Sequence, residues 1–137
     1  NIAYRDVLSI ILISLPQAMG IANIMLANNI CDIDDDIENK RYTLPIYIGK
    51  NASLVVFRVL YYIGYLSIIT ALVLKLLPLV SLLVLLTFII VQKNINIFNK
   101  KQSKKETFVL SVKNFAIVNL SLALTLGLGL IIDIIIK

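Results

Sequence analysis

The chain has 137 residues, of which 59% are hydrophobic and 15% are charged, and its mean hydropathy is +0.92. Soluble domains carry roughly 25% charged residues, so this composition excludes an ordinary soluble domain and indicates an integral membrane protein. The single cysteine excludes an internal disulfide and a metal site built from several thiolates. The net charge of +5 comes from short loops between apolar segments, which favours membrane topology over a nucleic-acid partner.

Four stretches are long and apolar enough to cross a bilayer, since a spanning helix needs about 20 mostly apolar residues. We predict spans at residues 4–29, 52–74, 79–96 and 108–136. Pro16 predicts a kink in the first span, and the third becomes interfacial from Gln92 to Phe98. The fold class is therefore all-α, a polytopic transmembrane bundle. Because the chain begins without Met and almost directly with a span, we expect a piece of a longer protein.

Small and polar side chains inside the spans predict where helices meet. Alanines in the first span, and a stripe in the last span, allow close packing: Ala18, Ala22 and Ala27, then Ser121, Thr125 and Gly129. Asn114 and Asn119 are expected to bond another helix, and Asp133 to lie at the outer interface. Tyr61, Tyr62 and Tyr65 favour packing over contact with a substrate.

A polar loop over residues 28–49 separates the first two spans and begins with Asn28 and Asn29. Five carboxylates follow within seven residues: Asp32, Asp34, Asp35, Asp36 and Glu38. These groups repel one another unless they are solvated, protonated or bridged by a cation. For Asp34 and Glu38, a solvated role and a functional role are equally supported by the sequence.

If the first helix continues into this loop, Asn28, Asp32 and Asp36 stack at i, i+4 and i+8, with Asn29 and Asp35 beside them. Ligation by oxygen alone selects a hard cation, Mg²⁺ or Ca²⁺. Mg²⁺ usually takes one or two protein carboxylates and completes its shell with water and substrate phosphates. We therefore predict a metal site at Asp32, Asp36 and Asp35 that receives a phosphorylated ligand.

The basic residues predict which side of the membrane this loop faces. Ten lie on the side of the acidic loop: Lys40, Arg41, Lys50, Arg58, Lys93, Lys100, Lys101, Lys104, Lys105 and Lys113. Arg5, Lys75 and Lys137 lie on the other side. The positive-inside rule then places the loop at the cytoplasmic face of the cell membrane and both chain ends outside. We attribute Lys100, Lys101, Lys104 and Lys105 to topology and to anionic lipids.

Three other interpretations of the acidic loop compete with this one. A solvated loop that merely ends a helix is common between spans. An EF-hand fails because Ile37 stands where Gly is needed and Thr43 stands where Glu should chelate. A CDP-alcohol phosphotransferase also uses D-x-x-x-D, but its upstream D-G-x-x-A-R element has no counterpart here.

The order Asn28-Asn29, Asp32-x-x-x-Asp36, Lys40-Arg41, Thr43-Leu44-Pro45 and Gly49 resembles the second aspartate-rich motif of the UbiA superfamily of intramembrane prenyltransferases. It is most similar to the menaquinone branch, the 1,4-dihydroxy-2-naphthoate polyprenyltransferases. Two positions depart from that branch, because Cys31 stands where Arg is usual and Lys40 where Gly is usual. We assign no role to Cys31.

The resemblance implies the C-terminal half of a fold of about nine helices, with the first aspartate motif in an N-terminal half that this chain does not contain. It implies Mg²⁺-dependent transfer of a polyprenyl group from its diphosphate to dihydroxynaphthoate. Asp32 and Asp36 would be catalytic, while Asn28, Asn29, Lys40 and Arg41 would bind the diphosphate. Two alternatives stay open: another aromatic acceptor, and a non-catalytic membrane subunit or half-transporter that binds divalent cations.

Overall fold

The computed structural model describes residues 4–136, and every regular element in that range is helical. The elements in chain order are α1 (Tyr4–Cys31), α2 (Ile33–Glu38), α3 (Leu44–Ile48), α4 (Lys50–Val73), the 3₁₀ helix η1 (Leu79–Leu86), α5 (Thr87–Lys100) and α6 (Phe108–Ile136). Within the described range, α1, α4, η1 with α5, and α6 are each long and apolar enough to cross a membrane. The predicted all-α class with four spans is confirmed.

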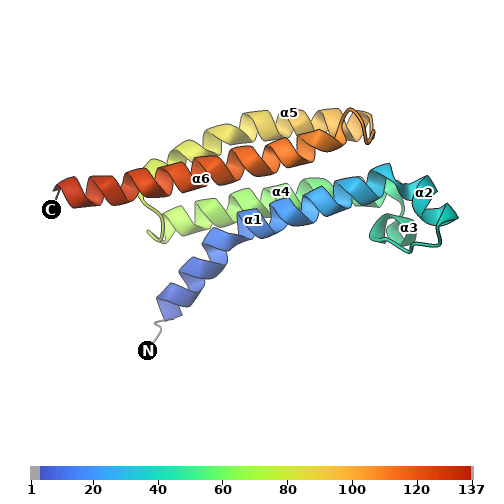
Figure 1. Cartoon of the computed structure of the whole chain (residues 1–137). Coiled ribbons are helices and arrows are strands. Elements are labelled where there is room, and N and C mark those ends of the chain that lie inside the picture. Colours follow the sequence, from blue (N-terminus) through green and yellow to red (C-terminus); the bar gives the residue numbers. More distant parts are fainter. Residues whose placement is uncertain (1–3, 137) are drawn as a thin grey trace.

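The long helices run side by side, with α1 against α4 and α6 against α5 (Figure 1). The short helices α2 and α3 lie at one end of the bundle, and the first turn of α1 and the last turn of α6 lie toward the opposite end. α1 bends in its first half, where Pro16 removes a backbone donor from the helix (Figure 1). The two ends of the bundle therefore differ, and only one carries the acidic loop.

The third span differs most from its prediction. It begins as the 3₁₀ helix η1 behind Pro78, becomes α-helical at Thr87 and continues to Lys100, beyond the predicted end at residue 96. Pro78 has an extended backbone before the first 3₁₀ turn, which suits a residue without an N–H. The polar residues 92–100 remain helical because Val91, Ile95 and Phe98 keep one face buried.

Small residues let the helices approach closely, as the sequence indicated for the last span. A Cβ on Gly64 of α4 would lie 3.3 Å from the Cα of Pro16, so the two backbones are almost in contact. A Cβ on Gly129 of α6 would lie 2.4 Å from the ring of Pro78. Of the predicted alanine contacts, Ala27 is fully buried, whereas Ala18 is exposed.

The intramembrane asparagines divide between two roles. Asn114 is fully buried, and its Oδ1 accepts a hydrogen bond from Nδ2 of Asn94 at 2.7 Å, which confirms a bond to another helix. Asn119 instead donates to the carbonyl of Phe115 in its own helix, so the predicted interhelical bond is wrong there. A side chain four residues after a carbonyl reaches it more easily than it reaches a neighbouring helix.

Two of the three tyrosines of α4 pack against the third span, and Tyr61 packs within α4. The hydroxyl of Tyr65 is 2.8 Å from that of Thr87, and Tyr62 donates to Gln92 at 2.9 Å. The ring of Tyr61 meets Phe57 edge to face, with centroids 5.2 Å apart. These contacts favour the packing interpretation.

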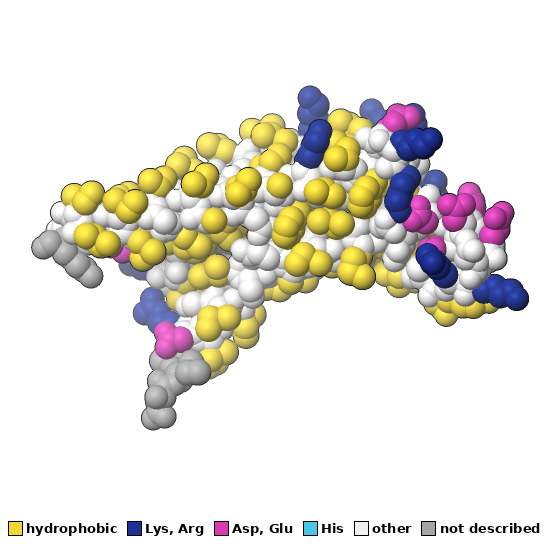
Figure 2. Space-filling view, in the orientation of Figure 1, with side chains coloured by type: hydrophobic (Ala, Val, Ile, Leu, Met, Phe, Trp, Pro, Cys, Tyr) yellow, Lys and Arg dark blue, Asp and Glu magenta, His cyan; other side chains and the backbone are white. Residues whose placement is uncertain are grey.

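Charged side chains gather at the end of the bundle that carries α2 and α3, and the flanks between the two ends are mostly apolar (Figure 2). Most large hydrophobic side chains of the spans are exposed on the described chain, as expected for surfaces that face lipid or further helices. Arg5 and Lys75 are the basic residues at the other end, and Lys137 lies outside the described residues.

Candidate functional site

The acidic loop begins with a break in the first helix. α1 ends at Cys31, and Asp32 has φ −105° and ψ 13°, outside the helical range, before α2 begins at Ile33. Two backbone hydrogen bonds still cross the break, from the N–H of Asp32 to Asn28 at 3.1 Å and from the N–H of Asp36 to Asp32 at 2.8 Å. The expected continuous helix is therefore interrupted, although its hydrogen bonding continues.

Asp32 and Asn28 lie next to each other, as their spacing predicted. The Nδ2 of Asn28 donates to Oδ2 of Asp32 at 3.1 Å. The ammonium of Lys104, from the link between α5 and α6, donates both to Oδ1 of Asn28 and to Oδ2 of Asp32. The Asp32 side chain is only 22% exposed, so its charge is largely screened by this lysine rather than by water. One cation is thus held by two oxygen atoms at the end of the first span.

Asp36 is buried, with 6% of its surface exposed, and it does not share this cation. Its Oδ2 accepts a hydrogen bond from the hydroxyl of Thr43 at 3.1 Å, and its backbone carbonyl accepts from the N–H of Arg41 at 2.8 Å. A buried carboxylate needs such donors to offset the loss of hydration. The break at Asp32 thus leaves the two predicted catalytic aspartates with different partners.

A tight turn follows the C-terminus of α2 and fixes the backbone of the basic pair Lys40 and Arg41. The N–H of Arg41 bonds the carbonyl of Asp36, and the N–H of Lys40 bonds that of Ile37, which together form a Schellman motif. Lys40 has φ 55°, the left-handed region that favours glycine. This explains physically why a glycine suits this position. The side chains of Lys40 and Arg41 are both exposed.

The remaining predicted site residues lie at the same end of the helix bundle. Asn29 is half-buried, and Asp34, Asp35 and Glu38 are exposed. Within residues 4–136, no three or more acidic, histidine or cysteine side chains come close enough to hold a metal ion together. Asp35 thus has no cluster with Asp32 and Asp36 in this structure.

A pocket of about 390 Å³ lies beside the acidic loop. Polar groups from four parts of the chain line it, namely Cys31, Asp34, Lys50 and Gln102, together with apolar residues of α1, α2 and α3. Asp32 and Asp36 are not in its lining. The half-buried Cys31 therefore lines this cavity and also packs against the hydrophobic core.

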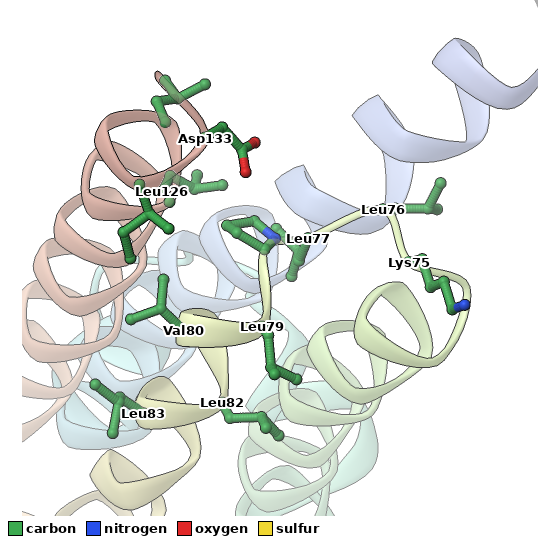
Figure 3. A pocket seen from close by; sticks show the side chains of 13 residues that line it. Lys75, Leu76, Leu77, Leu79, Val80, Leu82, Leu83, Leu126 and Asp133 are labelled. Carbon is green, nitrogen blue, oxygen red and sulfur yellow. The ribbon is translucent and has the colours of Figure 1, made fainter. Parts of the chain in front are cut away.

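A larger pocket, of about 1060 Å³, lies at the opposite end of the bundle (Figure 3). It is bounded by α6 and by the connection from Lys75 to η1, and its lining is apolar except for Lys75 and Asp133 (Figure 3). Asp133 is exposed near the end of α6, in keeping with an interfacial residue. This pocket is remote from the acidic loop, so a charged group bound at the acidic loop does not reach it.

Residues 2–122 match the UbiA prenyltransferase family, which is most of the chain. The chain belongs to the UbiA prenyltransferase family. Membership places the protein among integral membrane enzymes that transfer prenyl groups, in agreement with the four apolar spans. No curated protein and no solved structure matches the chain closely enough to be counted as a relative.

Part of the acidic loop fits the divalent cation that members of the UbiA family generally use. The carboxylate of Asp32 and the amide oxygen of Asn28 converge on one positive charge, that of Lys104. Two oxygen donors suffice for Mg²⁺, which fills the rest of its octahedron with water and phosphate oxygens. The observed ammonium therefore stands where a hard cation can be bound.

Lys104 is the residue that sequence reasoning missed. It was grouped with three neighbouring lysines as a topology signal, but Lys101 pairs with Glu106 at 2.6 Å while Lys104 contacts Asp32, 72 residues earlier. The sequence pattern of the four lysines does not distinguish them. Only the packing of α6 against α1 brings the link between α5 and α6 to the acidic loop.

Proposed function

We propose that this chain supplies the second aspartate motif of a Mg²⁺-dependent enzyme that transfers a polyprenyl group from polyprenyl diphosphate to an aromatic acceptor. The acceptor that the residues favour is 1,4-dihydroxy-2-naphthoate. This assigns the protein a step in menaquinone biosynthesis. Family membership supports prenyl transfer in general, while the cofactor, the acceptor and the site residues are our proposal.

One observation carries the proposal: Asn28 and Asp32 hold a cation between them at the end of an apolar span. A diphosphate with a long isoprenoid tail needs both a cationic grip at the membrane boundary and an apolar region for the tail. The acidic loop and the adjoining spans offer both at one end of the bundle. Asp36, buried beside Thr43, is the second carboxylate of the proposed site.

In the proposed reaction, the C–O bond to the diphosphate breaks and its electron pair leaves with the diphosphate. The acceptor ring carbon that bears the carboxylate forms the new C–C bond, and that carboxylate departs as CO₂ and leaves its bonding electrons to restore the aromatic ring. Mg²⁺ held by Asn28 and Asp32, and by Asp36 once its carboxylate leaves Thr43, would neutralise the charge on the leaving group. Lys40 and Arg41 would donate charge-assisted hydrogen bonds to its oxygens. The apolar helices exclude water from the allylic cation.

The preference for dihydroxynaphthoate rests on residues that resemble that branch, and two of them have structural reasons for their identity. Thr43 donates to the buried carboxylate of Asp36, so a hydroxyl is needed there. Gly49 has φ 81° and ψ 158°, a conformation open almost only to glycine. The motif residues thus shape the loop as well as bind ligands.

The test is prenyl transfer by the full-length protein in membranes. We expect Asp32→Asn and Asp36→Asn each to lower the rate about 100-fold or more, because charge stabilisation of the leaving group is lost. Glu38→Gln is the control: it removes an exposed carboxylate from α2, the short helix that also carries Asp36, and should change the rate less than about threefold. Full activity in an Asp32→Asn, Asp36→Asn double variant would contradict the proposal.

The acceptor is tested separately with the same membranes. Dihydroxynaphthoate should yield a decarboxylated prenyl product, and hydroxybenzoate and homogentisate should yield little. If one of the other aromatic acceptors is preferred, the reaction type stands but the assignment to menaquinone biosynthesis is wrong. Cation uptake without dependence on prenyl diphosphate would instead favour a transporter.

A further inference from the structure

The link between α5 and α6, residues 101–107, brings Lys104 to the acidic loop. The ammonium of Lys104 donates to Oδ1 of Asn28 and to Oδ2 of Asp32, and it also lies 5.4 Å from the centre of the Phe108 ring. The Lys104 side chain is 46% exposed, which leaves it room to move. The lysine is thus held by three groups but is not enclosed.

The backbone of this link is fixed, in contrast to the lysine side chain. The hydroxyl of Thr107 accepts from the N–H of Ser103 and contacts the carbonyl of Lys101, both at 2.9 Å. Gln102 donates to the carbonyls of Phe98 and Asn99. The link is therefore anchored at both ends, and the ammonium moves through rotations of the four-carbon side chain of Lys104.

A divalent metal and the Lys104 ammonium cannot occupy the same pair of oxygens. Mg²⁺ binds oxygen at about 2.0–2.1 Å. A metal bound by Asn28 and Asp32 would therefore need the space that the Lys104 ammonium occupies. The displaced ammonium would stay beside the acidic loop, where the phosphate oxygens of a metal-bound diphosphate would also lie. A diphosphate carries more negative charge than one Mg²⁺ neutralises, so it offers the lysine a new partner.

We propose that Lys104 is a mobile diphosphate-binding residue. It neutralises Asp32 in the ligand-free site, yields Asn28 and Asp32 to Mg²⁺, and then binds the diphosphate of the prenyl donor. This inference rests on the proposed function and deepens it, because it adds a residue from a distant part of the chain to the same site. It also gives the α5–α6 link a role in substrate binding rather than in topology alone.

The experiment uses the full-length protein in detergent with two matched variants, Lys104→Gln and Lys105→Gln. Both remove one positive charge from adjacent exposed positions, but only Lys104 contacts the acidic loop. Mn²⁺ binding, measured by electron paramagnetic resonance without any diphosphate, should become about fivefold tighter in Lys104→Gln because a competing cation is lost. Lys105→Gln should bind Mn²⁺ like the unchanged protein.

Steady-state kinetics with farnesyl diphosphate as the probe test the second half of the inference. Lys104→Gln should raise KM about tenfold, since a charge-assisted hydrogen bond to the substrate is lost, with a smaller effect on kcat. Lys104→Arg keeps the positive charge and should restore KM. Lys105→Gln should leave both parameters unchanged.

The outcomes separate this inference from the proposed function. If Lys104→Gln binds Mn²⁺ no more tightly than Lys105→Gln, or if its KM does not rise, the role of Lys104 is refuted while transfer still depends on Asp32. If Asp32→Asn retains full transfer, the proposed function itself fails. A Lys104→Gln protein that binds Mn²⁺ more weakly would mean that the lysine only holds the loop in place, which also refutes the inference.

Discussion

Two lysines occupy a backbone position that glycine usually fills. Lys40 lies two residues after the end of α2 and Lys75 two residues after the end of α4, each with φ 55°. Around each of them the same pair of hydrogen bonds closes the helix, and at Lys75 these run from Leu76 to Ala71 and from Lys75 to Leu72. A side chain in the left-handed region costs roughly 1 kcal/mol or more, so both turns carry a small strain.

Lys40→Gly should relieve that strain at the acidic loop. We expect the change to stabilise the protein by about 0.5–1 kcal/mol, because glycine adopts this φ without steric cost. Lys93→Gly is a matched control, since it removes an exposed lysine from the interior of α5 and should destabilise by about 1 kcal/mol. Thermal unfolding in detergent measures both. A fall in stability with Lys40→Gly would mean that the Lys40 side chain makes a compensating contact.

At the scale of elements, Gly49 joins the short helix α3 to the long helix α4. Its N–H bonds the carbonyl of Pro45, and its carbonyl accepts from the N–H of Ser53, so it ends one helix and begins the next. A Cβ added at Gly49 would have open space within 4 Å. The need for glycine here comes from φ 81° alone and not from packing.

Gly49→Ala should therefore destabilise the protein by about 1–3 kcal/mol through backbone strain. Gly127→Ala in α6 also has open space around its Cβ, but its backbone is helical, so it should be neutral or stabilise by up to about 1 kcal/mol. Comparison of the two unfolding temperatures separates backbone strain from packing. Equal shifts would show that the turn at Gly49 can change its conformation at little cost.

At the scale of the whole molecule, charge is concentrated at one end of an apolar bundle. Of the basic residues in the described chain, only Arg5 and Lys75 lie at the end opposite the acidic loop. From the positive-inside rule we predict that the acidic loop faces the cytoplasm. A water-soluble diphosphate head group would reach the site from that side.

Cysteine labelling tests this orientation. Lys105→Cys and Lys75→Cys, each in a Cys31→Ser background, place single exposed thiols at opposite ends of the bundle. A membrane-impermeant maleimide should label Lys75→Cys in intact cells and Lys105→Cys only after the cells are permeabilised. Labelling in the reverse order would invert the orientation and place the acidic loop outside.

The sequence by itself determined the four spans, the acidic loop and the basic end of the bundle. Each of these follows from local pattern, because about 20 apolar residues suffice to define a span and charges are excluded from the bilayer core. The contact between Asn28 and Asp32 was also predictable, since residues four apart on a helix are neighbours. Family membership agrees with the motif that these residues form.

Only the tertiary structure decided what each charged group contacts. After the break at Asp32, the carboxylate of Asp36 accepts a hydrogen bond from Thr43. Helix packing places Lys104, and not Lys101, against the acidic loop. Packing also paired Asn94 with Asn114 across two helices. Contacts between residues far apart in the chain depend on how whole helices pack, and hydropathy and residue spacing carry no information on that.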